Sequence, residues 1–166
     1  MKLPDGRHIE YVIDGQNRRV GKRMCATAID VPCATALDEG FVYRNQLQLA
    51  AWLNPDGSVR ARFVYGGRAN VPEYMVVPAG QTNAGTYRLV LDQVGTVRLV
   101  VDAANGAVLE RLDYDEFGKA TDTTVSAVHW TPFGFAGGLA DWDTGLVRLG
   151  RGTMRRRRGG GRTRTR

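Results

Sequence analysis

The sequence predicts an all-β fold of antiparallel hairpins, and three observations lead to this prediction. Glycine is abundant, with 21 residues against 6 prolines, which indicates many backbone positions with positive φ. Short β-branched or alternating segments separate recurrent turn signals. These signals, several of them nine to twelve residues apart, lie at seven glycines: Gly6, Gly15, Gly57, Gly95, Gly106, Gly118 and Gly145. We expect primed hairpin turns, in which Gly, Asn and Asp supply the positive φ angles.

The first half of the chain contains few clear strands. Residues 24–40 are rich in small side chains and are expected to form an irregular insertion. Residues 46–53 are good helix formers but too few to predict a helix. Residues 60–65 are expected to form a strand that ends at a Gly-Gly pair, and residues 66–86, with two prolines and several glycines, are expected to form a long loop.

The second half shows stronger strand patterns. Tyr87, Leu89 and Leu91 alternate with polar residues, and residues 97–101 are apolar and mostly β-branched. In the next segment, alternation predicts two opposite faces, with Val108, Leu112 and Tyr114 on one and Leu109, Arg111 and Asp113 on the other. Residues 120–131 are rich in Thr, Ser and Val and carry a weaker signal.

Charge divides the chain into two parts. The net charge is +6, yet all 17 acidic residues and 15 of the 23 Lys and Arg residues precede residue 151, which leaves that part at −2. The last sixteen residues carry eight arginines and no acid. We therefore predict a hairpin domain over residues 1–150 and a disordered Arg/Gly-rich tail over residues 151–166.

Several hairpins share one unit, in which an aromatic residue and a short strand precede an Asp, with a Gly soon after it. The aromatic packs across strands, the Asp accepts hydrogen bonds from turn amides, and the Gly takes the left-handed position. The unit occurs three times, as Tyr11 with Asp14 and Gly15, Tyr87 with Asp92 and Gly95, and Tyr114 with Asp115 and Gly118.

This unit resembles the tyrosine–aspartate (YD) repeats of the Rhs and teneurin proteins. The resemblance is most specific over residues 132–139, Asp141 and residues 143–148, which are similar to the opening of the bacterial RHS repeat-associated core. Residues 89–118 resemble the repeats that precede this core. The resemblance covers about residues 5–149.

The resemblance implies a structural role. In such proteins the hairpins spiral into a hollow β-shell that encloses a C-terminal toxin or presents a surface for contact between cells. We therefore expect a fragment of an Rhs-type shell from a polymorphic toxin system, with other YD-repeat segments as partners. The resemblance places it outside the cell or at the cell surface. No signal peptide or spanning segment is recognised, so a cytoplasmic stray fragment is the alternative.

The C-terminal residues depart from the family pattern. The family would continue after residue 150 with an aromatic- and Asp-rich core, an autoproteolytic segment and a toxin, whereas here the sequence becomes basic. We expect a truncated or frame-shifted product, marginally stable, with exposed edge strands that favour association. The arginine tail could also bind nucleic acid without sequence preference, which is the alternative function, although a solvated tail without a role is favoured.

No residue pattern predicts catalysis, so we expect a protein that is not an enzyme. Asp113, Asp115 and Glu116 cluster in sequence, as do Asp141 and Asp143, but Asp is favoured in turns for local hydrogen bonds. Self-cleavage through Asp141 or Asp143 is a third hypothesis, which we do not expect. The two histidines, His8 and His129, would need Ser58 or Ser126 as nucleophile, and neither serine lies in a nucleophile elbow.

Cofactor and metal sites are not expected either. The glycines at 134–138 and 159–161 lack the ending of a phosphate-binding loop and are interpreted as turn and linker residues. Cys25 and Cys33 lack the spacing of a zinc site. Two unpaired cysteines are favoured, and a disulfide is the alternative. The larger aromatics are expected to fill the core rather than to bind sugars: Trp52, Trp130, Trp142, Phe133 and Phe135.

Overall fold

A computed structural model describes residues 1–25, 37–116, 118–124, 129–149 and 152–154, and almost all of its regular structure is antiparallel β. Ten strands form one sheet in which each strand pairs with the next in sequence. They are β1 (His8–Ile13), β2 (Arg19–Cys25), β3 (Glu39–Tyr43), β4 (Leu49–Leu53), β5 (Val59–Val64), β6 (Tyr74–Val77), β7 (Gly85–Leu91), β8 (Val97–Asp102), β9 (Val108–Tyr114) and β10 (Ala120–Thr124). The all-β hairpin prediction is confirmed.

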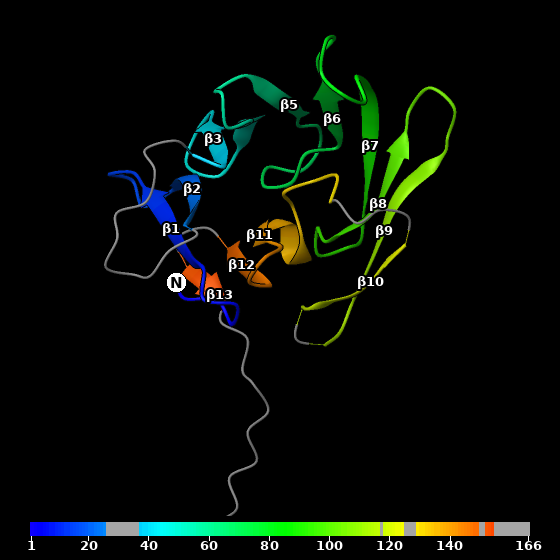
Figure 1. Cartoon of the computed structure of the whole chain (residues 1–166). Coiled ribbons are helices and arrows are strands. Elements are labelled where there is room, and N and C mark those ends of the chain that lie inside the picture. The colour runs from blue at the N-terminus through cyan, green and yellow to red at the C-terminus, as the bar shows by residue number, and fades with distance from the viewer. Residues whose placement is uncertain (26–36, 117, 125–128, 150–151, 155–166) are drawn as a thin grey trace, which may run out of the picture.

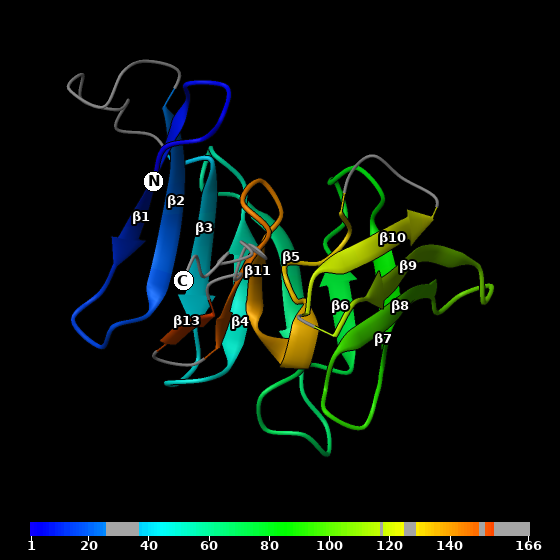
Figure 2. The ribbon, with the colours of Figure 1, turned by 90° about the horizontal axis from the view of Figure 1, so that it is seen from below.

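A second, smaller sheet lies against the first. It contains β11 (Leu139–Asp141), β12 (Leu146–Leu149) and β13 (Gly152–Met154), and a 3₁₀ turn at Phe135–Gly137 precedes it. The large sheet curves into an arch, and β11–β13 lie inside this arch (Figure 1). The view into the open side shows β11 in front of the middle strands (Figure 2). The core therefore forms between the concave face and the small sheet.

Four hairpin turns share one geometry, which differs from the primed turns that we predicted. They span residues 14–18, 54–58, 92–96 and 115–119. In each, the N–H of the first residue donates to the fifth carbonyl, and the N–H of the fourth donates to the first carbonyl. The fourth residue has positive φ, and the strand register shifts beside each turn. These are three-residue loops followed by a β-bulge.

The aspartates of these turns act as predicted. Oδ1 of Asp14 accepts hydrogen bonds from the backbone N–H groups two and four residues later, at 3.0 and 2.8 Å. Oδ1 of Asp92 does the same at 3.0 and 2.9 Å. Six of the seven turn glycines have positive φ. Gly15 does not, because the left-handed position of its turn is three residues after Asp14 and is held by Asn17, with φ 60°.

The bulges also change which side chains face the core. Between β8 and β9 the register shifts at Val100 and Val101, which makes Leu109 an extra residue. Val108 is therefore 45% exposed while Leu109 packs against the core, so the predicted faces are wrong at these two positions. Beyond the bulge the prediction holds, and Leu112 is fully buried.

Regular structure extends into segments that we predicted to be irregular. β6 lies within the expected loop at 66–86, where three of its residues pair with β5 and all four pair with β7. The expected insertion at 24–40 is wrong at both ends, since β2 reaches Cys25 and β3 begins at Glu39. Residues 26–36 lie outside the described residues. The helix formers at 46–53 instead form a turn and β4.

The domain boundaries can be compared with the edges of the large sheet and with the last strand of the small sheet. β1 and β10 are the edge strands. Next to β1, Met1 and Ile9 exchange backbone hydrogen bonds. β13 continues the small sheet just past the expected boundary at residues 150–151, and residues 155–166 lie outside the described part of the chain. The division into hairpin domain and tail stays a prediction.

Among the described residues, no helix has the length and apolar character needed to cross a bilayer.

Candidate functional site: the contact between the sheet and the inner segment

Residues 129–149, here called the inner segment, cover the concave face of the large sheet. Local hydrogen bonds shape the segment: Ala140 N donates to Pro132 O at 2.8 Å, and Gly134 N donates to Gly138 O at 2.9 Å. Gly137 has φ 69°, a conformation that glycine adopts without strain. The segment contacts the sheet in three places, which are a charged end at β1 and β2, an apolar middle and an aromatic end at β9.

The charged end joins residues that are about 120 positions apart in sequence. Lys22 Nζ on β2 donates to Asp141 Oδ1 at 3.0 Å and also bonds the Asp143 carboxylate. Tyr11 Oη on β1 donates to Asp141 Oδ2 at 2.5 Å. Arg19 Nη2 donates to Ala140 O at 3.1 Å. The Asp141 side chain is fully buried and that of Lys22 is 3% exposed, so this charge pair depends on its partners.

The partners stabilise the charged forms of both groups. Burial acts to raise the pKa of Asp141, but the Tyr11 hydrogen bond and the Lys22 charge outweigh it and lower this pKa below its ordinary value. Burial likewise acts to lower the pKa of Lys22, and the hydrogen bond to Asp143 and the charge of Asp141 raise it. Burial and the hydrogen bond to Asp141 raise the pKa of Tyr11 to about 12.

This geometry explains what the acidic pair does. Both Asp141 and Asp143 hold Lys22, and Asp141 Oδ1 also accepts the backbone N–H of Asp143 at 3.1 Å. Because a buried carboxylate with these partners stays ionised, it is suited to fixing β11 against β2 rather than to exchanging a proton. The sequence pointed to Asp141 and Asp143, and it carried no signal for Lys22 and Arg19.

The apolar middle is closely packed. The rings of Phe63 on β5 and Phe133 meet edge to face with centroids 5.0 Å apart. Val71 is completely buried, and a Cβ added at Gly137 would overlap its side chain. Near β9, a Cβ added at Gly118 would lie 2.8 Å from the Phe135 ring. Two glycines therefore permit the inner segment to approach the sheet.

The aromatic end is organised by one buried carboxylate. Glu110 on β9 has a side chain that is 3% exposed, and its two oxygens contact His129 Nδ1 at 2.7 Å and the backbone N–H of Trp130 at 3.0 Å. The Trp142 ring stacks on His129 with centroids 3.7 Å apart, and Trp130 packs beside Tyr87 at 5.2 Å. The expectation that the tryptophans and Phe133 pack in or against the core is confirmed.

The remaining sequence candidates do not come together in one site. Asp113 pairs with Arg111 at 2.9 Å and Asp115 accepts the N–H of Lys119 in its turn. Ser58 Oγ accepts a hydrogen bond from Asn54. Ser126 lies outside the described residues. That no catalytic residue is present stays a prediction.

One group of potential metal ligands lies at the N-terminal edge. Ligand atoms of His8, Glu10 and Cys25 lie within 4.8 Å of one another. Cys25 is disulfide-bonded, so its sulfur is no thiolate, and the preference for unpaired cysteines is wrong for this residue. Cys33 lies outside the described residues. Without a thiolate this group lacks one of the ligands that zinc prefers.

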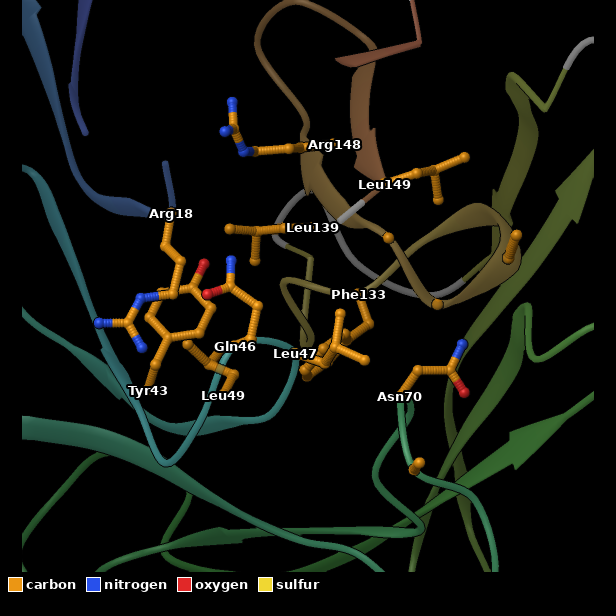
Figure 3. Close-up of a pocket in the computed structure, with 14 residues that line it drawn as sticks. Arg18, Tyr43, Gln46, Leu47, Leu49, Asn70, Phe133, Leu139, Arg148 and Leu149 are labelled. Carbon is orange, nitrogen blue, oxygen red and sulfur yellow. The ribbon is translucent and has the colours of Figure 1, made fainter. Parts of the chain in front are cut away.

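Several cavities border the inner segment. One of them, of about 580 Å³, lies between the β3–β4 turn and the inner segment and is lined by apolar residues such as Leu49 and Leu139 (Figure 3). Its arginines have partners, since Arg18 bonds Asp14 and Arg148 bonds Asn17. A second cavity, of about 410 Å³, lies at the aromatic end, beside Trp130 and His129.

These features define a β-shell segment, in which a wall of hairpins surrounds its own inner segment. The Teneurin YD-shell family model matches residues 4–156, and the chain belongs to this family. The identification of the YD repeats and of the shell-type fold is thereby confirmed. No curated protein sequence matches the chain.

Solved structures share the fold. A Tc holotoxin pore of Photorhabdus luminescens with mutated TccC3 is 16% identical, with a TM-score of 0.56 over 89% of this chain and 7% of that one. TcdB2-TccC3-TEV is 18% identical, with a TM-score of 0.55 over the same shares. TcdB2-TccC3 without its hypervariable C-terminal region is 18% identical, with a TM-score of 0.53 over 87% and 7%. This chain thus spans about 7% of the length of each.

Proposed function

We propose that this chain is a section of the wall of a YD shell that encloses a toxin polypeptide, and that it has no catalytic activity of its own. The observation that carries the proposal is the uninterrupted order of ten antiparallel strands curved around a covered concave face. Strands in this order can be continued at either edge by further hairpins, at β10 on one side and on the other at the part of β1 that follows Ile9, whose backbone already bonds Met1. The wall therefore extends by repetition.

The proposed partners follow from this role. Other YD-repeat segments would pair with the edge strands, and a toxin-type polypeptide would lie beyond the open side of the arch. The solved structures of similar fold come from Tc toxin proteins, which supports a toxin as the enclosed polypeptide. The same likeness supports a location outside the cell. For nucleic-acid binding by residues 151–166, no described residue offers support.

Protease protection in the assembled shell tests the enclosure. The tagged chain is purified together with the polypeptides that it binds, and the complex is digested before and after unfolding. We expect a polypeptide without YD repeats to survive digestion in the native complex and to be degraded after unfolding. Enclosure is rejected if every bound polypeptide is digested in the native complex as fast as when free.

Intact-mass spectrometry of the purified chain tests the absence of catalysis. We expect a single mass after days at neutral pH. A discrete fragment that Asp141→Asn abolishes would show self-cleavage and contradict the proposal.

A further inference from the structure

Arg60 on β5 is turned toward the concave side by a β-bulge. Trp52 pairs with Ala61 and Leu53 pairs with Val59, so Arg60 is the extra residue between them. Strict alternation would place Arg60 on the outer face, because Ala61 and Phe63 are buried. Instead its guanidinium lies 3.7 Å from the centroid of the Trp52 ring, which belongs to the core. Bulges commonly redirect a side chain in this way.

Within the described part of the chain, the guanidinium of Arg60 has no anionic partner at ion-pairing distance. Among the described residues, no ion pair or hydrogen bond engages it. Burial lowers the pKa of Arg60, and the only charge that opposes this effect, Glu39, lies beyond ion-pairing distance and faces Lys22. A half-buried cation that stacks on an indole keeps its five N–H donors for another acceptor.

The cavity of about 410 Å³ in front of Arg60 is lined by polar as well as apolar residues, and the amide groups of Asn54 and Gln81 bond each other and Ser58. The residues that line it include no acid. His129 lies on its wall with Nδ1 held by Glu110, which leaves Nε2 for another contact. Trp130 and Met75 are apolar lining residues, and the polar lining residues are Asn54, Gln81, Thr82 and Asn83. One permanent cation, donors and an apolar wall together suit an anion that carries an apolar group.

We propose that this cavity binds a carboxylate through Arg60, with the apolar part of the ligand against Trp130 and Met75. A guanidinium fork matches the two oxygens of a carboxylate. The carboxylate can come from a free organic acid or from an acidic side chain of a polypeptide. The site does not depend on the enclosure proposed above, because the residues that form it are all present in this chain.

An equivalent position shows that an unpaired arginine is not a general feature of these bulges. Arg98 is the extra residue after the turn at 92–96, because Leu91 pairs with Val97 and Val90 pairs with Leu99. There the guanidinium meets Asp113 at 4.0 Å. Arg98→Gln is therefore a matched control for Arg60→Gln.

Binding is measured on the full chain by NMR, from the Arg60 Nε–H and Trp130 indole resonances, during titration with benzoate at constant ionic strength. Benzamide has the same shape without the charge and is the control ligand. Acetylated Gly-Glu-Gly amide and its Gln counterpart form the peptide arm. We expect saturable shifts with benzoate or the Glu peptide, and none with benzamide or the Gln peptide. The tighter of the two binders identifies the source of the carboxylate.

The variants complete the test. Arg60→Gln should weaken binding at least tenfold and Arg98→Gln less than twofold, with both variants as folded as the wild type by their NMR spectra. Arg60→Lys, which keeps the charge but loses the fork, should lie between them. Absence of saturable binding, or equal binding by Arg60→Gln, overturns the proposal. Equal or tighter binding of phosphate at the same resonances overturns the assignment to a carboxylate.

Discussion

The hairpin turns and the inner segment are held by contacts of opposite kinds. The turn at 92–96 is closed by bonds within five residues, from Asp92 to its own loop. The inner segment is held by Lys22 and Tyr11, which bind Asp141 across more than a hundred residues. The turn contacts are exposed or only partly buried, so we expect water to replace much of what is lost when one is removed. The inner contacts are buried, so a lost partner leaves an unsatisfied charge. The contacts that close the hairpins of the large sheet are thus short-range and repeated from turn to turn. The attachment of the inner segment to this sheet depends on few residues.

Removal of Lys22 should give the largest effect. Lys22→Met leaves the buried Asp141 carboxylate without its main cation, and we expect a loss of about 3–5 kcal/mol in the free energy of unfolding. Urea denaturation followed by tryptophan fluorescence measures it. Lys119→Met, at an exposed position, is the control and should change stability by less than about 0.5 kcal/mol. Equal effects of the two variants would show that the buried pair is unimportant.

Gly137→Ala should follow in size. The left-handed backbone costs an alanine about 1–2 kcal/mol, and the new Cβ overlaps Val71, which adds about 1–3 kcal/mol. Gly106→Ala is the matched control, since Gly106 has φ 78° but nothing within 4 Å of the added Cβ. Thermal denaturation of both variants separates the backbone effect from the packing effect. A Gly137→Ala variant no less stable than Gly106→Ala would contradict the close approach to Val71.

Stability should fall at both ends of the pH range. The pKa of Asp141 is lowered in the folded state, so its contribution is present above the unfolded pKa and is lost as the pH falls through the folded value. The pKa values of Lys22 and Tyr11 are raised, so their contributions are present below their unfolded values and are lost as the pH rises above them, for Tyr11 from about 10 to about 12. Denaturation curves from pH 2 to 12 measure this. In Asp141→Asn the loss of stability on acidification should become smaller, and an unchanged acid limb would contradict the assignment.

Loss of one turn carboxylate should give the smallest effect. Asp92→Ala removes two side-chain hydrogen bonds at the surface of one hairpin, and we expect a loss of about 1–2 kcal/mol. Because the other turns keep their own bonds, amide exchange should increase only near β7 and β8. Increased exchange across β1 and β2 would show that the turns are not independent.

The local features could be predicted from the sequence, because their causes are local. The Asp92–Gly95 spacing indicated a turn with a left-handed glycine, and the structure confirms both. The bulges were missed because one extra residue hardly alters the alternation of a short strand. For that reason the predicted faces of Val108 and Leu109 were reversed. β6 was missed because Pro72 and Pro78 bracket only four strand residues.

The long-range contacts could not be predicted for a different reason. Lys22 precedes another basic residue in a strand, a pattern that indicates a solvent-exposed position. It is buried because β11 packs against β2. Glu110 shares a strand face with the buried Leu112, but its partners His129 and the backbone N–H of Trp130 come from the inner segment. Arg60 likewise reads as an outer-face residue until the register shift beside Trp52 is known. In each case the surroundings of the side chain depend on another element of the fold, and the sequence near the residue does not indicate which element that is.

A double-mutant cycle between Lys22→Met and Asp141→Asn tests whether this pair attaches the inner segment to the large sheet. We expect the double variant to be less destabilised than the sum of the single variants, by about 1–3 kcal/mol. The cycle between Lys22→Met and Asp92→Ala serves as the control and should be additive within about 0.5 kcal/mol. Additive effects of Lys22→Met and Asp141→Asn would show that the two side chains do not act as a pair.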